Sequence, residues 1–447
     1  MNRIIGKKKY SAQNNRNRRH DNGSMRYLWI CVWLIVIGWL LFNVSAITNY
    51  IHNINLSKNI NHPQIVSFRK TNIISNASID YKTHLRGTSS TIKSIENYNN
   101  KKKVAYAVTV TKDSSFVDGA LVLGYAAHKV HGLTKSIYKD INNENYNSIY
   151  DIDLIAFVAP SVNSSRNLLQ KYGWKILERP LPVELYEIEN KDYAEKMKNS
   201  GCCGASEFLK LWAYTLTEYD RVIHLDMDSI IYQNMDELYN TTYELQHTGD
   251  YNMAVRPVPP VQGGFLVIKP SKSRFEEFRD IIRKGDYHPG SGWAQSHIGK
   301  FWGGSTIQGI MPYFYHKIHS GDALELNRCI YNVMVDNPYR PYKDEDSPKK
   351  CLNGQPTCED CRKQKFHNVK SAHFTICQKP WTCTKHDNPR NKVLCEQLHQ
   401  EWFILRHEFE IENNINTGYR YTQTKYKESL GICRGYGDKK YIPIPIK

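Results

Sequence analysis

The first 27 residues of the chain contain a single acidic residue, Asp21, and the 20 residues that follow contain no charged residue at all. Eight lysines and arginines precede residue 27, so much of the net charge of +16 lies in this tail. A basic excess of this size is typical of nucleic-acid-binding proteins. Here it gathers on one side of an uncharged run, which instead indicates a signal for membrane topology. The sequence therefore predicts no nucleic-acid partner.

Residues 28–47, the uncharged run, predict a transmembrane signal-anchor. At about 1.5 Å per residue, a helix of this length spans the roughly 30 Å hydrocarbon core of a bilayer. The basic tail, residues 1–27, would then be cytoplasmic and the remainder lumenal, as in a type II membrane protein of the Golgi. The endoplasmic reticulum and secretion are the alternatives, because Val44-Ser45-Ala46 is also an acceptable signal-peptide cleavage site.

Beyond the anchor, the composition changes from a stem to a folded domain. Residues 48–103 are rich in Asn, Ser, Ile and Lys without periodicity, which predicts a flexible stem. Strand-like and helix-like segments then alternate, so we expect an α/β domain over residues 104–395, with a mixed, mostly parallel sheet flanked by helices. Loops that are rich in cysteine begin at about residue 329, and residues 396–447 form a C-terminal extension. The expected segments are 104–110, 116–130, 154–158, 163–172, 206–216, 221–225, 265–268 and 272–283.

Ten of the eleven cysteines follow the uncharged run, and an even number suits disulfides in an oxidising lumen. A zinc site built on Cys358 and Cys361 is the alternative, with Cys351 and either His367 or Cys377 as further ligands. The vicinal pair Cys202-Cys203 has no assigned role. Glycosylation sequons, which predict a glycoprotein, begin at Asn55, Asn76, Asn163 and Asn240.

Two carboxylates, Asp226 and Asp228, directly follow the apolar run 222–225. Such a run predicts a buried parallel strand, and ligands of open α/β sheets bind beyond the carboxyl ends of these strands. Hard oxygen ligands suit Mg²⁺ or Mn²⁺ that carries a diphosphate. Nucleotide-sugar transferases and aspartyl phosphatases both use such a pair. At least two strands precede this one, and Gly321-Asp322 has no acidic neighbour just downstream, which disfavours the phosphatase.

Four segments, in order and at plausible spacings, resemble glycogenin and its relatives in glycosyltransferase family 8, whose members are retaining enzymes of the GT-A fold. The resemblance covers roughly residues 104 to 385. It implies Mn²⁺-dependent transfer of a hexose-type sugar from a UDP-sugar to a glycan, glycolipid or glycoprotein acceptor. The segments are VAYAVTVTKDSSFVDGALVLG (104–124), FLKLWAYTLTEYDRVIHLDMDSIIYQNMDEL (208–238), GGFLVIKPS (263–271), and AHF (372–374) followed by KPW (379–381).

The resemblance implies a composite site for the cation and the diphosphate. Asp226, Asp228 and His373 would bind Mn²⁺, or alternatively Mg²⁺, between the two phosphates of the donor. Lys379 would lie against the β-phosphate and neutralise charge as UDP leaves. A hydrogen-bonded structural histidine and a solvated lysine are the corresponding structural alternatives.

Further contacts with the UDP-sugar follow from the same resemblance. Phe116 would stack on the uracil, and Lys210 would face the donor sugar; helix packing and a surface lysine are the alternatives. The full set implied by the resemblance is Val110, Asp113, Phe116, Lys210, Met227, Gly264 and Lys379.

Two departures from the family pattern concern the donor sugar. Gln262-Gly263-Gly264 stands where the family has Asn-Ser-Gly, and Ile307-Gln308-Gly309 stands where it has Asp-Gln-Gly. Gln262 and Gln308 remain as candidate catalytic-site amides, but an aspartate is missing. This loss motivates an alternative function, a lumenal pseudoenzyme that binds nucleotide or glycan without transfer. Candidates for stacking in an acceptor cleft, with core packing as the alternative, are Trp293, Trp302, Tyr313 and Tyr315.

Overall fold

The computed structural model describes residues 101–134, 150–200, 204–253, 256–340, 349–415 and 426–445. All of these residues belong to one compact unit, Leu85–Lys447. The expected tail, membrane anchor and nearly all of the stem lie outside the described residues, as do Cys202, Cys203 and the first two sequons. No helix within the described ranges is both long enough and apolar enough to cross a membrane.

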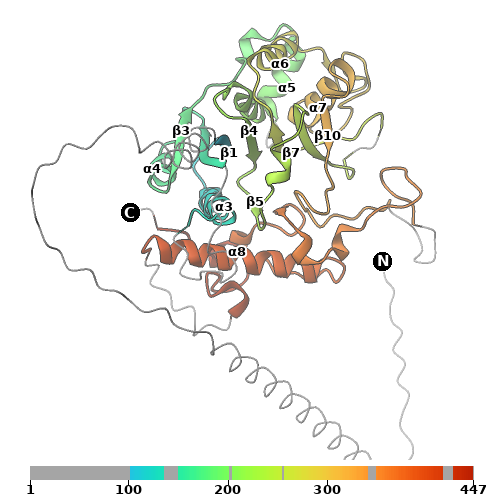
Figure 1. The fold of residues 1–447 in the computed structure, drawn as a ribbon. Helices are drawn as coiled ribbons and strands as arrows, with labels where there is room; N and C mark the ends of the chain where they lie inside the picture. Colours follow the sequence, from blue (N-terminus) through green and yellow to red (C-terminus); the bar gives the residue numbers. More distant parts are fainter. Residues whose placement is uncertain are drawn as a thin grey trace, which may run out of the picture. The chain divides into compact units, whose positions relative to one another are not determined.

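A seven-stranded sheet forms the centre of the unit (Figure 1). Its strands are β1 Lys102–Val110, β2 Tyr150–Val158, β3 Trp174–Glu178, β4 Arg221–Leu225, β6 Leu245–Gly249, β7 Val261–Ile268 and β10 Ala323–Glu325. They follow the order β10-β6-β7-β4-β1-β2-β3. Strand β7 runs antiparallel to both of its neighbours, and the other adjacent pairs are parallel. The predicted mixed, mostly parallel sheet is therefore confirmed.

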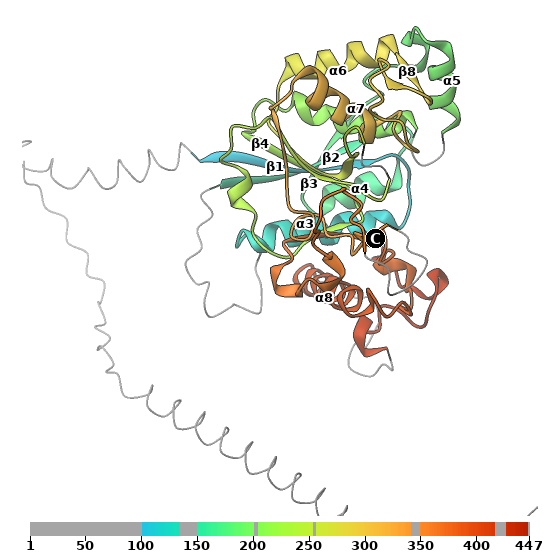
Figure 2. The same cartoon turned by 90° about the vertical axis from the view of Figure 1, so that its right-hand side faces the viewer.

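Helices cover both faces of this sheet. Figure 2 shows α3, α4 and α8 on one side and α5, α6 and α7 on the other. The helices are α3 Phe116–Val130, α4 Ser164–Lys171, α5 Lys191–Asn199, α6 Lys272–Lys284, α7 Ile307–Tyr313 and α8 Lys392–Glu412. Two minor sheets pair β5 Ser229–Ile231 with β11 Ser371–His373, and β8 Tyr287–His288 with β9 Gly292–Trp293. A long 3₁₀ helix, η2 Ala205–Thr215, replaces the α-helix predicted at 206–216.

Strand β1 explains why helices are required on both faces. Side chains alternate across a strand, and six of the seven residues from Val104 to Val110 are buried. Val104, Tyr106 and Val108 join a core with α3, α4 and α8. Ala105 and Ala107 join the opposite core, with η2, α5, α6 and α7. A strand with two apolar faces thus fixes the middle layer of the fold.

Helix α8 is a feature that the sequence interpretation missed. It crosses residue 396, where the extension was expected to begin, and packs against α3 (Figure 1). Its buried apolar residues recur at helical spacing and include Leu394, Leu398, Trp402, Leu405 and Phe409. They belong to the same core as β1, so the folded unit continues beyond residue 395. The dense cysteines nearby led us to expect loops, although the apolar spacing was present in the sequence.

A buried ion-pair network ties the end of the chain to α3. The fully buried Arg406 of α8 donates from Nε to Glu410 at 2.9 Å and faces Asp118 of α3 at 3.9 Å. The Asp118 carboxylate also accepts hydrogen bonds from the Tyr441 hydroxyl, at 2.7 Å, and from the Ile444 N–H, at 2.9 Å. The segment after α8 is therefore part of the fold.

Eight cysteines of the described ranges form disulfides, as predicted in preference to zinc. Every cysteine of the alternative zinc set is paired. Two of the bonds anchor the loop around Lys379, one to α8 and one to the C-terminal segment. The pairs are Cys329–Cys361, Cys351–Cys358, Cys377–Cys395 and Cys383–Cys433.

Candidate functional site

The acidic pair lies where β4 ends, at the edge of the sheet where the parallel strands present their carboxyl ends. The Asp226 N–H donates to the Gly264 carbonyl of β7 at 3.2 Å, and Ser229 N–H donates to the Asp226 carbonyl at 2.9 Å. A tight turn therefore carries both carboxylates. Helix α3 packs against this turn through Gly119, where a Cβ atom would lie only 2.2 Å from the Met227 carbonyl oxygen.

His373 reaches this turn because β11 pairs with β5, directly after the acidic pair. Its Nε2 atom lies 3.2 Å from Asp228 Oδ1 and 3.8 Å from Asp226 Oδ2. One potential ligand atom from each of the three side chains lies within 4.8 Å of the other two. Two carboxylates and one imidazole at this spacing fit a divalent cation.

Close approach of these side chains depends on Gly264. A Cβ atom at this position would lie 2.4 Å from His373 Cε1 and 2.9 Å from Asp226 Oδ2. Any side chain here would therefore displace His373 or Asp226. Because Gly264 has no side chain, His373 and Asp226 can approach each other beside β7.

Two lysines flank the carboxylates. The Lys379 Nζ atom lies 3.1 Å from Asp228 Oδ2, so Asp228 faces both His373 and Lys379. Burial opposes ionisation of Asp228, but His373 and Lys379 outweigh it and hold its pKa well below the usual range. Conversely, burial opposes a charge on His373, and the Asp228 and Asp226 carboxylates raise its pKa. Positive charge from His373 and Lys379 thus lies against the carboxylates of the acidic pair.

Lys210 lies on the opposite side of the acidic pair and is almost completely buried. Its Nζ atom contacts Asp226 Oδ1 at 2.8 Å, Glu207 Oε2 at 2.9 Å and the Gly263 carbonyl at 3.2 Å. Burial disfavours its charge, yet the Asp226 and Glu207 carboxylates raise the pKa of Lys210. The surface-lysine alternative is therefore wrong, because this ammonium group is enclosed and bridges two acids.

The residues predicted to hold the nucleotide lie at the carboxyl end of β1 and the start of α3. Val110 is buried, and the Phe116 ring makes an edge contact with Trp381, 5.2 Å between centroids. Asp113 accepts hydrogen bonds from the N–H groups of Asn163, Ser164 and Ser165, at 3.1, 3.3 and 2.8 Å, and so caps the start of α4. Hydrogen bonds from Ser165 hold the pKa of Asp113 below its usual range. These hydrogen bonds hold the Asp113 carboxylate at the start of α4.

No family model matches the chain. It is similar to human glycogenin-2, with 24% identity over 328 residues, which cover 71% of this chain and 52% of that protein. It is also similar to inositol phosphorylceramide glucuronosyltransferase 1 of Arabidopsis thaliana, with 26% identity over 239 residues, or 52% of this chain and 37% of that enzyme. The predicted resemblance to glycogenin-like glycosyltransferases is confirmed.

The matches thus span about half, or less, of the length of these two relatives. Among solved structures, the chain aligns with the galactosyltransferase LgtC in complex with donor and acceptor sugar analogues. This alignment covers 68% of the chain and 95% of LgtC, with 14% identity and a TM-score of 0.36.

The positions that depart from the glycogenin-like pattern lie around Lys210. Gln262 is buried, and its Oε1 atom accepts a hydrogen bond from the Gly264 N–H at 2.6 Å. Its amide therefore holds the β7 backbone in place beside Asp226 and His373. Ile307, in place of the missing aspartate, is fully buried and lies 3.2 Å from the position of a Cβ atom on Gly263. Gln308, in the first turn of α7, is half-buried. An apolar side chain therefore occupies the position of a family carboxylate.

The four aromatic candidates for an acceptor cleft do not lie together on the surface. Trp293 is buried and donates from Nε1 to the Gly304 carbonyl at 2.8 Å. Tyr315 is buried as well, and its hydroxyl lies 2.8 Å from that of Tyr214. These two side chains form core, the alternative that the sequence left open. Trp302 is 66% exposed, and Tyr313 is half-buried.

Asp250 is a candidate that the sequence interpretation missed. It follows β6 and is buried near His373. Burial and the Asp336 carboxylate raise the pKa of Asp250 to about 6, against smaller opposing effects that include His373. The segment before it, residues 245–249, is largely polar, so no local pattern in the sequence predicts a buried strand that ends at Asp250.

Proposed function

We propose that the chain is a Mn²⁺-dependent, retaining glycosyltransferase that moves a hexose-type sugar from a UDP-sugar to a glycan, glycolipid or glycoprotein. The observation that carries this proposal is the convergence of Asp226, Asp228 and His373 with Lys379, in a chain that resembles glycogenin. A site with this charge pattern suits a diphosphate bridged to a divalent cation. The retaining outcome follows from the family resemblance.

Each flanking residue has a distinct role in this proposal. The bound cation would act as a Lewis acid on the diphosphate leaving group. Lys379, now paired with Asp228, would neutralise the charge that develops as UDP departs. Lys210, in contact with Asp226 Oδ1 at 2.8 Å, would orient this carboxylate from the protein side. Phe116, the first residue of α3 after β1, would stack on the base.

Donor selection would depend on the rebuilt region around Gln262, Ile307 and Gln308. The buried Ile307 offers no hydrogen bond to a sugar hydroxyl, so recognition would fall to the two amides. This arrangement supports a donor sugar that differs from the one that the family aspartate contacts.

We also propose a lumenal, Golgi location for the folded unit. The four disulfides suit an oxidising compartment. The sequon residues Asn163 and Asn240 are both exposed on the fold, as glycosylation requires. In cells, we expect an endoglycosidase-sensitive mass shift that becomes smaller in Asn163→Gln and in Asn240→Gln, each by the mass of one glycan. Full protease sensitivity in sealed microsomes, without any mass shift, would contradict this location.

The activity is tested by UDP release from a panel of UDP-sugars by the purified full-length chain, with and without Mn²⁺. We expect release from at least one donor, dependent on Mn²⁺ and reduced at least about 100-fold by Asp228→Asn. Asp280→Asn, at an exposed position on α6, is the matched control and should leave the rate unchanged. Binding of UDP and Mn²⁺ without turnover of any donor would refute the transferase and support the pseudoenzyme.

A further inference from the structure

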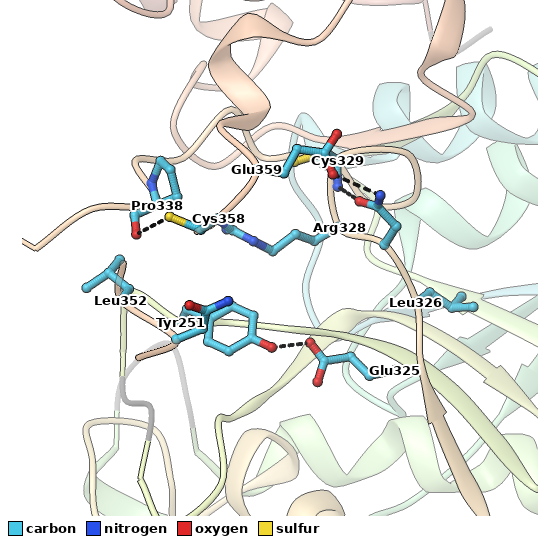
Figure 3. Close-up of a pocket in the computed structure, with 11 residues that line it drawn as sticks. Tyr251, Glu325, Leu326, Arg328, Cys329, Pro338, Leu352, Cys358 and Glu359 are labelled. Carbon is cyan, nitrogen blue, oxygen red and sulfur yellow. Dashed lines mark hydrogen bonds between the residues drawn. The ribbon is translucent and has the colours of Figure 1, made fainter. Parts of the chain in front are cut away.

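A hollow of about 170 Å³ opens between the end of β6, the end of β10 and the cysteine-rich loops (Figure 3). Tyr251 and Glu325 form one wall, with the tyrosine hydroxyl donating to Glu325 Oε1 at 2.6 Å. Arg328 extends over the Tyr251 ring, 5.4 Å from its centroid, and Glu359 lies on the far side. None of these residues belongs to the cation site described above.

The hollow lies at the same edge of the sheet as the acidic pair. Strands β4, β6 and β10 run in one direction, so the residues that follow them meet at one edge. Asp226 follows β4, Tyr251 lies two residues after β6, and Glu325 ends β10. Asp250, directly before Tyr251, also follows β6 at this edge, and Arg328 of the hollow forms an ion pair with Asp336.

Strand order gives the direction in which a donor would extend. Phe116, the proposed contact of the base, lies beyond β1, and the acidic pair lies beyond β4. Continuing along the sheet in this direction leads to β7, then β6, then β10. A nucleotide sugar with its base beside β1 and its diphosphate beside β4 would therefore direct its sugar toward the hollow.

The charges of the hollow favour a neutral ligand. Arg328 already forms an ion pair with the buried Asp336, so its charge is balanced. Glu325 and Glu359, both exposed at the rim, leave the hollow with an excess of negative charge. Carboxylates are strong acceptors for hydroxyl donors, and an aromatic ring offers an apolar face to a sugar. An anionic ligand would meet like charges instead.

Two disulfides hold the walls in place. Cys329, next to Arg328, is bonded to Cys361, and Cys358, next to Glu359, is bonded to Cys351. The cysteine-rich loops that carry Arg328 and Glu359 are thus cross-linked, which reduces the conformational cost of ordering them around a ligand.

We propose that this hollow is a subsite for one uncharged sugar ring of the acceptor, held by Glu325 and the Tyr251 ring. This inference rests on the proposed function for the identification of the bound sugar as an acceptor. Sugar binding itself does not depend on turnover, so the two proposals can fail separately.

Saturation-transfer NMR with the full-length chain tests the subsite directly. The probes are the methyl glycosides of glucose, galactose, xylose and N-acetylglucosamine, with methyl glucuronide as the anionic probe, each up to tens of millimolar. We expect at least one neutral glycoside to bind and the glucuronide not to bind. Glu325→Gln and Tyr251→Leu should each weaken that binding roughly ten-fold, with UDP binding unchanged. Glu276→Gln, an exposed carboxylate on α6, is the control and should have no effect.

Glu325→Lys separates recognition from a merely structural role, because it should lower neutral-sugar binding and introduce glucuronide binding. Failure of every neutral glycoside to bind, or unchanged binding in Glu325→Gln and Tyr251→Leu, would overturn the subsite. If a neutral glycoside binds as expected but does not act as an acceptor with any UDP-sugar that the enzyme turns over, its assignment to the acceptor is overturned. If no UDP-sugar is turned over while the glycoside binds, the proposed function fails and the sugar site stands.

Discussion

His373 Nε2 lies 3.2 Å from Asp228 Oδ1, although 145 residues separate the two in the chain. The contact exists because β11 pairs with β5, immediately after the acidic turn. It places an imidazole nitrogen beside carboxylate oxygens and makes the candidate cation site depend on the whole fold of the domain.

Gly264→Ala should disable the cation site with little change elsewhere. The new methyl group would clash with His373 Cε1, at 2.4 Å, and approach Asp226 Oδ2, at 2.9 Å. We expect the affinity for Mn²⁺-UDP to fall at least about ten-fold, together with a stability cost of about 1–3 kcal/mol from overpacking. Calorimetric titration measures the affinity. Gly290→Ala is the matched control, because a Cβ atom there meets nothing within 4 Å; equal affinity in both variants would contradict this role.

Lys210→Met should lower the free energy of unfolding by about 2–3 kcal/mol, less than for a fully buried pair because the two carboxylates are partly exposed. The substitution keeps the bulk of the side chain but leaves Asp226 and Glu207 without their shared ammonium group. Because a cation can compensate the charge of Asp226, added Mn²⁺ should restore part of the loss. Urea denaturation with and without Mn²⁺ measures both effects. The exposed Lys198→Met serves as the control, and an identical loss there would argue against the buried bridge.

The Cys377–Cys395 disulfide should support the site as well as the fold. It closes a loop of 18 residues that contains Lys379, so Cys377→Ser with Cys395→Ser should cost about 3 kcal/mol of stability. Affinity for UDP with Mn²⁺ should fall in the same variant, because Lys379 is released from Asp228. Loss of Cys351–Cys358, separated by 7 residues, should cost about 2 kcal/mol and leave UDP binding intact. Equal UDP affinity in both variants would contradict the coupling.

Acid should destabilise the fold in part through His399. Burial and the neighbouring His386 lower the pKa of His399 to about 3. The unfolded chain takes up this proton near pH 6.5 and the folded chain does not, so stability is lost as pH falls below about 6.5. This residue alone should contribute a loss of about 1.4 kcal/mol between pH 7.5 and pH 5.5. Urea midpoints at the two pH values should therefore differ less in His399→Gln than in the wild type, while the exposed His367→Gln should match the wild type.

The sequence predicted the parts of the site that follow local rules. An apolar run that ends in Asp226 and Asp228 specifies a buried strand with ligands at its end, and motif order added His373 and Lys379. The other features of the site depend on packing between segments that are far apart in the sequence. The double ion pair of Lys210 depends on the packing of η2 against β4, and the position of Asp250 depends on the place of β6 in the sheet order. Neither relation has a signature in the local sequence.

Helix α8 and the pairing of the cysteines were not predicted from the sequence either, for a different reason. The apolar residues of α8 recur at helical spacing, but the cysteines around them outweighed that signal in our interpretation. Disulfide connectivity depends on which loops meet after folding, so Cys329 pairs with Cys361 rather than with a nearer cysteine. Spacing alone predicts that such bonds form, whereas the tertiary fold determines the partners.

Pulsed electron paramagnetic resonance of Mn²⁺ bound to the full-length chain in the presence of UDP tests the central claim most directly. Our account predicts a coupling between the ion and one imidazole nitrogen, which disappears in His373→Gln, and loss of bound Mn²⁺ in Asp228→Asn. A spectrum of bound Mn²⁺ that lacks nitrogen coupling, or that is unchanged in His373→Gln and Asp228→Asn, would contradict the assignment of Asp226, Asp228 and His373 as the cation site.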